Sequence, residues 1–284
     1  MLLQRVITAL VLLAILLPAL FYPSVTPFAL VVLVFMAAGA WEWGRLNGCG
    51  NAAALGLSAV CLALCAGSRW AGWLDRPLPL LWTLGGGLWV ACTAWLLRAG
   101  VPGWPLIPAP VRIVLGVLAL WLAWLAVVQA RILGINFLLS VLTLVWVADN
   151  FAYFAGRAFG LRFTRNKLAP SISPGKSWEG VWGGLAGVLC LAVAWVAADR
   201  YFQADVASFY TRLYSAGWWF LAIAVVFMVA MSVAGDLVES LIKRSAGVKD
   251  SSGLLPGHGG VLDRVDALLP TLPLALMLTR LISV

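Results

Sequence analysis

Charged residues are scarce in this sequence of 284 residues: they make up 11% of the chain, whereas hydrophobic residues make up 63%. An ordinary soluble domain carries about 25% charged residues, and one of this length could not bury so much apolar surface. Long runs in which polar and apolar residues alternate, as in a transmembrane barrel, are also absent. The composition therefore excludes a soluble globular fold and indicates membrane-spanning helices.

Several common functional motifs are missing as well. The five cysteines are odd in number and form no Cys-x-x-Cys pair, which predicts free packing side chains rather than disulfides or a metal site. Gly175-Lys176-Ser177 does not have the upstream glycine that a P-loop requires. No nucleic-acid-binding module accompanies the net charge of +8, which is typical of membrane proteins with basic cytoplasmic loops.

Nine apolar runs are long enough to cross a hydrocarbon core, which needs roughly 20 residues of helix. The first run is predicted to be a transmembrane helix rather than a signal peptide, because no convincing small-residue cleavage site follows it. The fold class we expect is an all-α polytopic integral membrane protein with about nine transmembrane helices. It forms one membrane domain over 1–284, with N-terminal spans in 1–140 and catalytic helices and loops in 141–284. The predicted spans are 6–22, 25–41, 52–67, 78–97, 113–130, 132–149, 181–198, 217–235 and 261–282.

The basic residues predict the orientation in the membrane. If the N-terminus and the loops near 45, 98–112, 150–178 and 236–264 share one side, that side carries 13 of the 19 Lys and Arg residues. The other side then carries the remaining 6. Because basic loops stay inside, both long polar loops are expected in the cytoplasm, where they form an interfacial active site.

The first polar segment covers residues 145–180. Asp149 ends an apolar run, and Asn150, Tyr153, Gly156 and Arg157 follow at spacings that place them on one helical face. Beyond them, prolines break the helix, and hydroxyls and positive charge lead into the next span as a candidate phosphate cradle. The predicted substrate-binding residues here are Lys167, Ser171, Ser173, Lys176 and Ser177.

The second polar segment covers residues 234–270 and mixes carboxylates with cations. Asp263 and Asp266 lie three residues apart at the start of the last span, hence on one face of its first turn. Such a pair can simply cap a helix, but the same segment also supplies Asp236 within the membrane. Carboxylate oxygens beside Lys and Arg suit Mg²⁺ shared with substrate phosphates. The predicted metal ligands are Asp236, Asp263 and Asp266, and the predicted catalytic residues are these three with Lys243, Arg244, Lys249 and Arg264.

The 27 residues from Ser240 to Asp266 resemble the signature of the phosphatidate cytidylyltransferases, or CDP-diacylglycerol synthases. They carry Lys243-Arg244, Lys249-Asp250, a Pro-Gly-His-Gly-Gly run at 256–260 and Asp263-Arg264-Val-Asp266 without departure from that pattern. The segment 167–180 also resembles the family's other polar motif. The resemblance implies transfer of a cytidylyl group from CTP to phosphatidic acid, with release of pyrophosphate. It also implies Mg²⁺, with K⁺ as a possible second cation, and a homodimer in the cell (inner or plasma) membrane.

Two residues of the glycine-rich run are predicted to bind substrate. His258 is suited to donate to the leaving pyrophosphate, although a structural role that ties down the loop explains it equally well. Gly259 permits a close approach of the backbone to phosphate, or it simply makes a turn. Mg²⁺ prefers oxygen ligands, so His258 is not expected to bind it.

Two other functions would also use charged residues near the membrane surface. A transporter for an anionic metabolite predicts interrupted helices in both halves of the chain, but the charges gather in the C-terminal half. A CDP-alcohol phosphotransferase also uses interfacial aspartates and Mg²⁺, but the sequence pattern of that family is missing here.

Overall fold

Nine apolar helices of membrane-spanning length make up most of the structure, a computed structural model that describes residues 2–282. Their number confirms the prediction and the all-α polytopic membrane fold. The first eight are α1 (Leu2–Phe21), α2 (Thr26–Leu46), α3 (Asn51–Trp70), α4 (Pro79–Ala99), α5 (Ala109–Leu133), α6 (Ile135–Phe159), α7 (Trp178–Tyr201) and α9 (Trp218–Ser245). The ninth combines α10 (Leu262–Val265) and α11 (Leu268–Ile282).

Two helices extend well beyond their apolar runs. The predicted spans ended at residues 149 and 235, whereas α6 continues to Phe159 and α9 to Ser245. The apolar pattern stops earlier because the following residues are polar, but no proline interrupts the helix. Gly247, in the left-handed conformation at φ +72°, follows the end of α9. Asp149 and Asp236 therefore lie inside helices and not at their ends.

The last span is interrupted just after the turn that carries Asp263 and Asp266. Asp266 keeps a helical backbone (φ −47°, ψ −51°), so the two aspartates share one turn, as predicted. Asp263 belongs to the short α10, whereas Asp266 lies in the break before α11. The backbone N–H of Ala267 donates to Asp266 Oδ1 at 2.8 Å, and Pro270 occupies the first turn of α11, where a missing N–H is tolerated.

The segment predicted as a phosphate-binding loop is a β-hairpin. β1 (Lys167–Ala169) pairs antiparallel with β2 (Ser173–Ser177), with Lys167 opposite Ser177. The sequence did not predict this hairpin, because two prolines suggested a loop. Two further short elements were not predicted: the 3-10 helix η1 (Val101–Leu106) and α8 (Phe209–Ser215).

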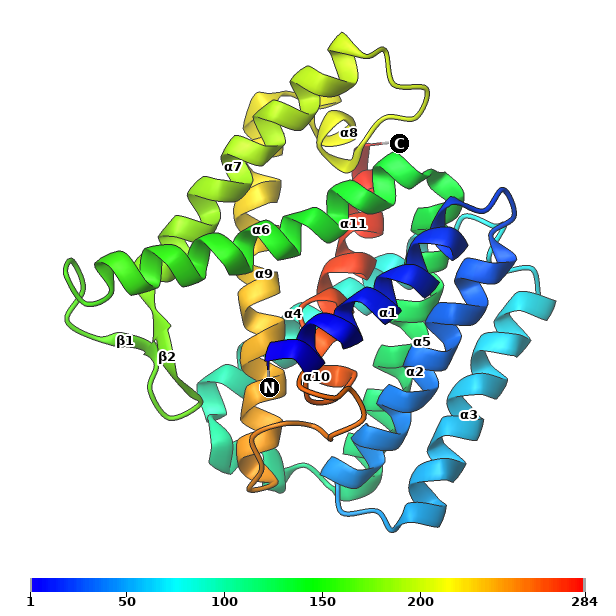
Figure 1. Ribbon diagram of the computed structural model, residues 1–284, viewed down its shortest axis with the longest axis vertical. Coiled ribbons are helices and arrows are strands. Elements are labelled where there is room, and N and C mark those ends of the chain that lie inside the picture. The colour runs from blue at the N-terminus through cyan, green and yellow to red at the C-terminus, as the bar shows by residue number, and fades with distance from the viewer. Residues whose placement is uncertain (1, 283–284) are drawn as a thin grey trace.

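Close packing of α6 against α7 places the hairpin (Figure 1). Glycines on α7 allow this contact: a Cβ at Gly184 would lie 2.8 Å from the carbonyl oxygen of Ala148, and one at Gly183 would lie 2.1 Å from Ala155 Cβ. Small residues that face a neighbouring helix let two helices approach closely within a membrane. The hairpin at the end of this pair consequently lies beside α9, which it contacts through β2.

Candidate active site

Asp236 on α9 meets Lys176 on β2. Lys176 Nζ lies 2.6 Å from Asp236 Oδ2, and the hydroxyl of Ser240, one turn further along α9, donates to Asp236 Oδ1 at 3.2 Å. Both members of the ion pair are partly exposed. The structure thus joins the two polar segments that the sequence separates by about 60 residues.

Two more aspartates lie within electrostatic range of Asp236. Asp149 comes from α6 and Asp266 from the break between α10 and α11. Lys176 and Lys243 are the cations that act on this group. Asp149, Asp236 and Asp266 are together called the aspartate group. The negative charges of such a group repel one another, and a bound cation relieves that repulsion.

Lys243 is enclosed by carboxylates. Its ammonium forms ion pairs with Glu239, one turn before it on α9, and with Asp263 Oδ1 at 2.5 Å. The side chains of all three are largely buried. Removing one partner of a buried ion pair destabilises a protein by about 3–5 kcal/mol, because the other charge is left buried and unpaired.

The second oxygen of Asp263 holds the glycine-rich loop. Asp263 Oδ2 accepts hydrogen bonds from Ser251 N at 2.9 Å, Ser251 Oγ at 3.0 Å and Gly260 N at 2.8 Å. Gly259 adopts φ +82°, and a Cβ there would lie 2.7 Å from Asp263 Oδ2. Glycine is therefore required at 259 for the backbone to close around this carboxylate.

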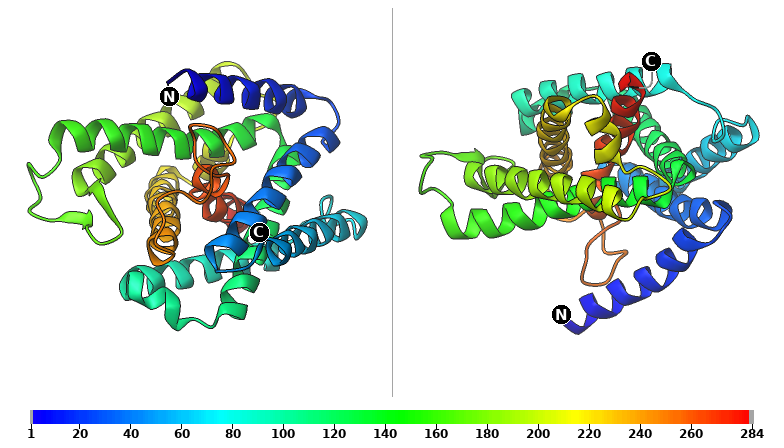
Figure 2. Two further views of the ribbon diagram at one scale, coloured as in Figure 1. Left: turned by 60° about the horizontal axis from the view of Figure 1, so that its bottom comes forward. Right: turned by 90° about the horizontal axis from the view of Figure 1, so that it is seen from above.

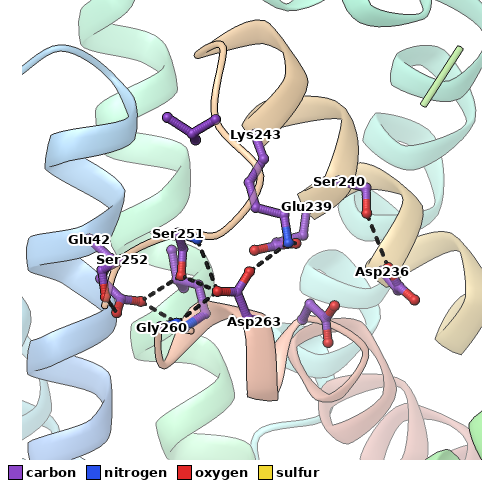
Figure 3. Close-up of polar contacts among 12 residues, drawn as sticks. Glu42, Asp236, Glu239, Ser240, Lys243, Ser251, Ser252, Gly260 and Asp263 are labelled. Carbon is purple, nitrogen blue, oxygen red and sulfur yellow. Dashed lines mark hydrogen bonds and ion pairs between the residues drawn. The ribbon is translucent and has the colours of Figure 1, made fainter. Parts of the chain in front are cut away.

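Glu42 on α2 is a site residue that the sequence did not reveal. It is fully buried and accepts hydrogen bonds from Ser251, Ser252, Val261 N and Leu262 N (Figure 3). The predicted second span ended at residue 41, so Glu42 was left at the membrane surface. The available signal was an acidic residue between two tryptophans in an apolar stretch.

Glu179 was also missed. It is buried at the start of α7, and its Oε1 accepts from Phe163 N, Thr164 N and the hydroxyl of Thr164. Ser177, predicted to bind substrate, caps the same helix by accepting from Gly180 N at 3.2 Å. These contacts hold the loop after α6 and the β-hairpin in place beside the aspartate group.

Several of the predicted substrate-binding and catalytic residues face solvent. Lys167 donates across the hairpin to the carbonyl of Pro174 at 2.7 Å, and Arg244 donates to the carbonyl of Val248 at 3.3 Å. Ser173 is half-buried. The exposed members of the predicted set are Lys167, Ser171, Arg244, Lys249 and Arg264.

His258 lies in the loop with a buried nitrogen that has no partner. Its Nδ1 finds no hydrogen-bond acceptor or donor within the described residues 2–282, while its backbone N–H donates to the carbonyl of Leu255 at 2.8 Å. From the other side, Arg5 and Thr8 of α1 donate to the carbonyls of Gly257 and Pro256, both at 2.9 Å. The N-terminal end of α1 therefore lies against this loop, as Figure 2 shows.

An apolar cavity of about 540 Å³ adjoins the site. Its wall combines apolar side chains of α2, α4 and α5 with Glu239 and Asp266. This volume falls in the range of small-molecule pockets, about 300–1,000 Å³.

The donor set suits Mg²⁺ better than a metal that needs a complete protein cage. Within residues 2–282, no three His, Cys, Asp or Glu side chains form a ready-made metal centre. Mg²⁺ usually takes one or two carboxylates and completes its shell with waters and substrate phosphates. The aspartate group supplies oxygen atoms with an excess of negative charge and fits this requirement.

Comparisons with known proteins identify the family of the chain. A model of the cytidylyltransferase family matches residues 3–282. A phosphatidate cytidylyltransferase of Pseudomonas aeruginosa is 40% identical over 286 residues, which cover 96% of this chain and 95% of that protein. Enzymes of the same name from Haemophilus influenzae and Thermotoga maritima are 51% and 40% identical over 140 and 146 residues. These shorter matches cover 49% and 51% of this chain, and 44% and 49% of those proteins.

Proposed function

The chain belongs to the cytidylyltransferase family and makes CDP-diacylglycerol and pyrophosphate from CTP and phosphatidate, and we propose that Asp236, Asp263 and Asp266 form its Mg²⁺ site. The observation that carries this proposal is the gathering of carboxylates around two lysines. Asp236 pairs with Lys176, Asp263 pairs with Lys243, and Asp266 lines the adjoining cavity together with Glu239. Asp263 Oδ2 is engaged with the loop and Oδ1 pairs with Lys243. Asp236, Asp263 and Asp266 would hold Mg²⁺, which would neutralise charge on the CTP phosphates.

The basic residues bind and orient the two substrates. Lys176 and Lys243 lie among the carboxylates and contact the phosphates of CTP, while the exposed Arg244, Lys249 and Arg264 attract CTP and the lipid phosphate. A phosphate oxygen of phosphatidate attacks the α-phosphorus of CTP, and the bond to the departing pyrophosphate breaks. A phosphate monoester is largely ionised near neutral pH, because its second pKa is about 6. The reaction therefore needs no general base.

The apolar cavity receives an acyl chain of phosphatidate. It lies among membrane-spanning helices and shares Asp266 with the aspartate group, so a lipid held there has its phosphate beside the reacting centre. His258, with an unpartnered Nδ1, Gly259 and the hydroxyls of Ser171, Ser173 and Ser177 complete the substrate site.

The orientation and the surroundings of the enzyme are also proposals. The excess of Lys and Arg on the side of the polar segments supports an active site that faces the cytoplasm from the cell membrane. K⁺ as a second cation and a homodimer rest on the family resemblance alone.

A product assay tests the cation proposal. Purified protein given phosphatidate and labelled CTP is expected to form labelled CDP-diacylglycerol with Mg²⁺, to stop with EDTA, and to recover when excess Mg²⁺ is added. Replacing K⁺ with a large organic cation is expected to slow the same reaction. Undiminished product formation in EDTA would contradict the proposed site.

A further inference from the structure

Glu42 is a buried carboxylate whose partners all come from the signature loop and the start of α10. Its Oε1 accepts from Ser252 Oγ and, at 2.8 Å, from Val261 N. Its Oε2 accepts from Leu262 N at 2.8 Å and from Ser251 Oγ at 3.2 Å. All four donors are neutral. An ionised carboxylate is costly to bury within a membrane protein, and these four hydrogen bonds make its burial tolerable.

The contacts of Glu42 lead directly to a proposed metal ligand. The hydroxyl oxygen of Ser251 lies 3.2 Å from Glu42 Oε2 and 3.0 Å from Asp263 Oδ2, so its single proton is shared between the two carboxylates. Gly260 lies between them: a Cβ there would be 2.4 Å from Glu42 Oε1, and its N–H donates to Asp263 Oδ2. Figure 3 shows these groups in one continuous series from α2 to Lys243.

Glu42 also fixes the backbone on which both signature aspartates are placed. Its two oxygens hold the consecutive N–H groups of Val261 and Leu262, immediately before Asp263. Asp266 follows one turn later and donates its own N–H to the carbonyl of Leu262 at 3.0 Å. A change at Glu42 therefore acts on the backbone of both Asp263 and Asp266, whereas Asp236 lies on the separate helix α9.

We infer that Glu42 is a positioning residue for the cytidylyltransfer reaction: it ties the N-terminal helices to the signature loop and sets the place of Asp263 and Asp266. This inference rests on the proposed metal site. In this role Glu42 acts through Ser251 and the backbone at 261–262, which its carboxylate holds.

The substitution Glu42→Gln keeps the size of the side chain but replaces one acceptor oxygen with an NH₂ group that faces two donors. We expect kcat to fall about 10- to 100-fold, as for residues that orient metal ligands. The Mg²⁺ concentration at half-maximal rate is expected to rise, with little change in KM for phosphatidate. Glu42→Asp, which keeps both acceptors on a shorter stem, is expected to recover part of kcat.

A purely structural role is separated by a control and by a double-mutant cycle. Gln129 on α5 is buried and donates to the carbonyls of Trp73 and Arg76. Gln129→Leu is expected to lower the unfolding temperature while kcat per folded molecule stays at the wild-type value. Combined with Asp263→Asn, Glu42→Gln is expected to lower kcat much less than it does alone, because coupled residues are not additive.

Two results would overturn the inference: a Glu42→Gln protein with wild-type kcat and Mg²⁺ dependence, or losses that multiply fully in the double variant. If Glu42→Gln does not fold, Ser251→Ala carries the same test, because it removes the side chain that bridges the two carboxylates. A wild-type enzyme that needs no divalent cation would instead overturn the proposed metal site, so the two failures are distinguishable.

Discussion

Glu42 and the aspartate group differ in how their carboxylate oxygens are occupied. Glu42 has four neutral donors on its two oxygens. Asp149, Asp236 and Asp266 instead lie within electrostatic range of one another and accept few hydrogen bonds. Lys176 neutralises charge at Asp149 and Asp236, and Lys243 at Asp266. A fully bonded carboxylate anchors backbone, whereas a group with excess negative charge retains capacity for a cation. Asp263 lies between the two: its Oδ2 shares the Ser251 hydroxyl with Glu42, and its Oδ1 pairs with Lys243 on α9.

The largest expected effect is at Asp266. Asp266→Asn removes a charge from the aspartate group, and we expect kcat to fall about 100- to 1,000-fold, as when a group that stabilises transition-state charge is lost. The unfolding temperature is expected to stay the same or to rise, because repulsion with Asp236 is relieved. Turnover of labelled CTP and thermal unfolding of the purified protein check the two parts.

Asp75 provides the matched control for that substitution. It is exposed and lies outside both polar segments, so Asp75→Asn is expected to change neither turnover nor stability. Near-wild-type turnover of Asp266→Asn would show that this carboxylate is not part of the reacting centre.

A smaller effect is expected at Lys176, the cation of the aspartate group. Lys176→Met removes a phosphate contact, and a hydrogen bond to a charged group contributes about 1.5–3 kcal/mol, so KM for CTP is expected to rise about tenfold or more. The Mg²⁺ concentration at half-maximal rate is expected to fall, because the site becomes more negative. Lys167→Met, at an exposed residue of the same hairpin, is expected to have a weaker effect on KM. A higher Mg²⁺ requirement in Lys176→Met would contradict the account of this group.

The sequence predicted the number of spans and the signature residues, because long apolar runs and fixed spacings are local features. The apolar runs alone placed the ends of two spans too early, at 149 and 235, although the spacing of the polar residues after Asp149 already indicated a continuing helix. Polar residues continue a helix wherever no breaker intervenes. The sequence also missed the hairpin at 167–177, where two prolines suggested a loop.

Glu42 shows most clearly why the rest of the site could not be predicted. Its partners lie more than 200 residues away in the chain, and nothing in the local pattern of α2 identifies them. Lys176 and Asp236 are likewise joined only by the packing of α6 and α7 that places the hairpin. Contacts between distant segments require the fold.

The place at which the divalent cation binds is the central feature of the proposed site. Mn²⁺ prefers oxygen ligands as Mg²⁺ does, so its binding to the purified protein can be followed by electron paramagnetic resonance with CTP present. We expect saturable binding to the wild-type protein, retained affinity in Asp75→Asn, and loss of most of the affinity in Asp266→Asn. Equal Mn²⁺ affinity in Asp266→Asn and the wild type would contradict the central claim that Asp236, Asp263 and Asp266 hold the cation.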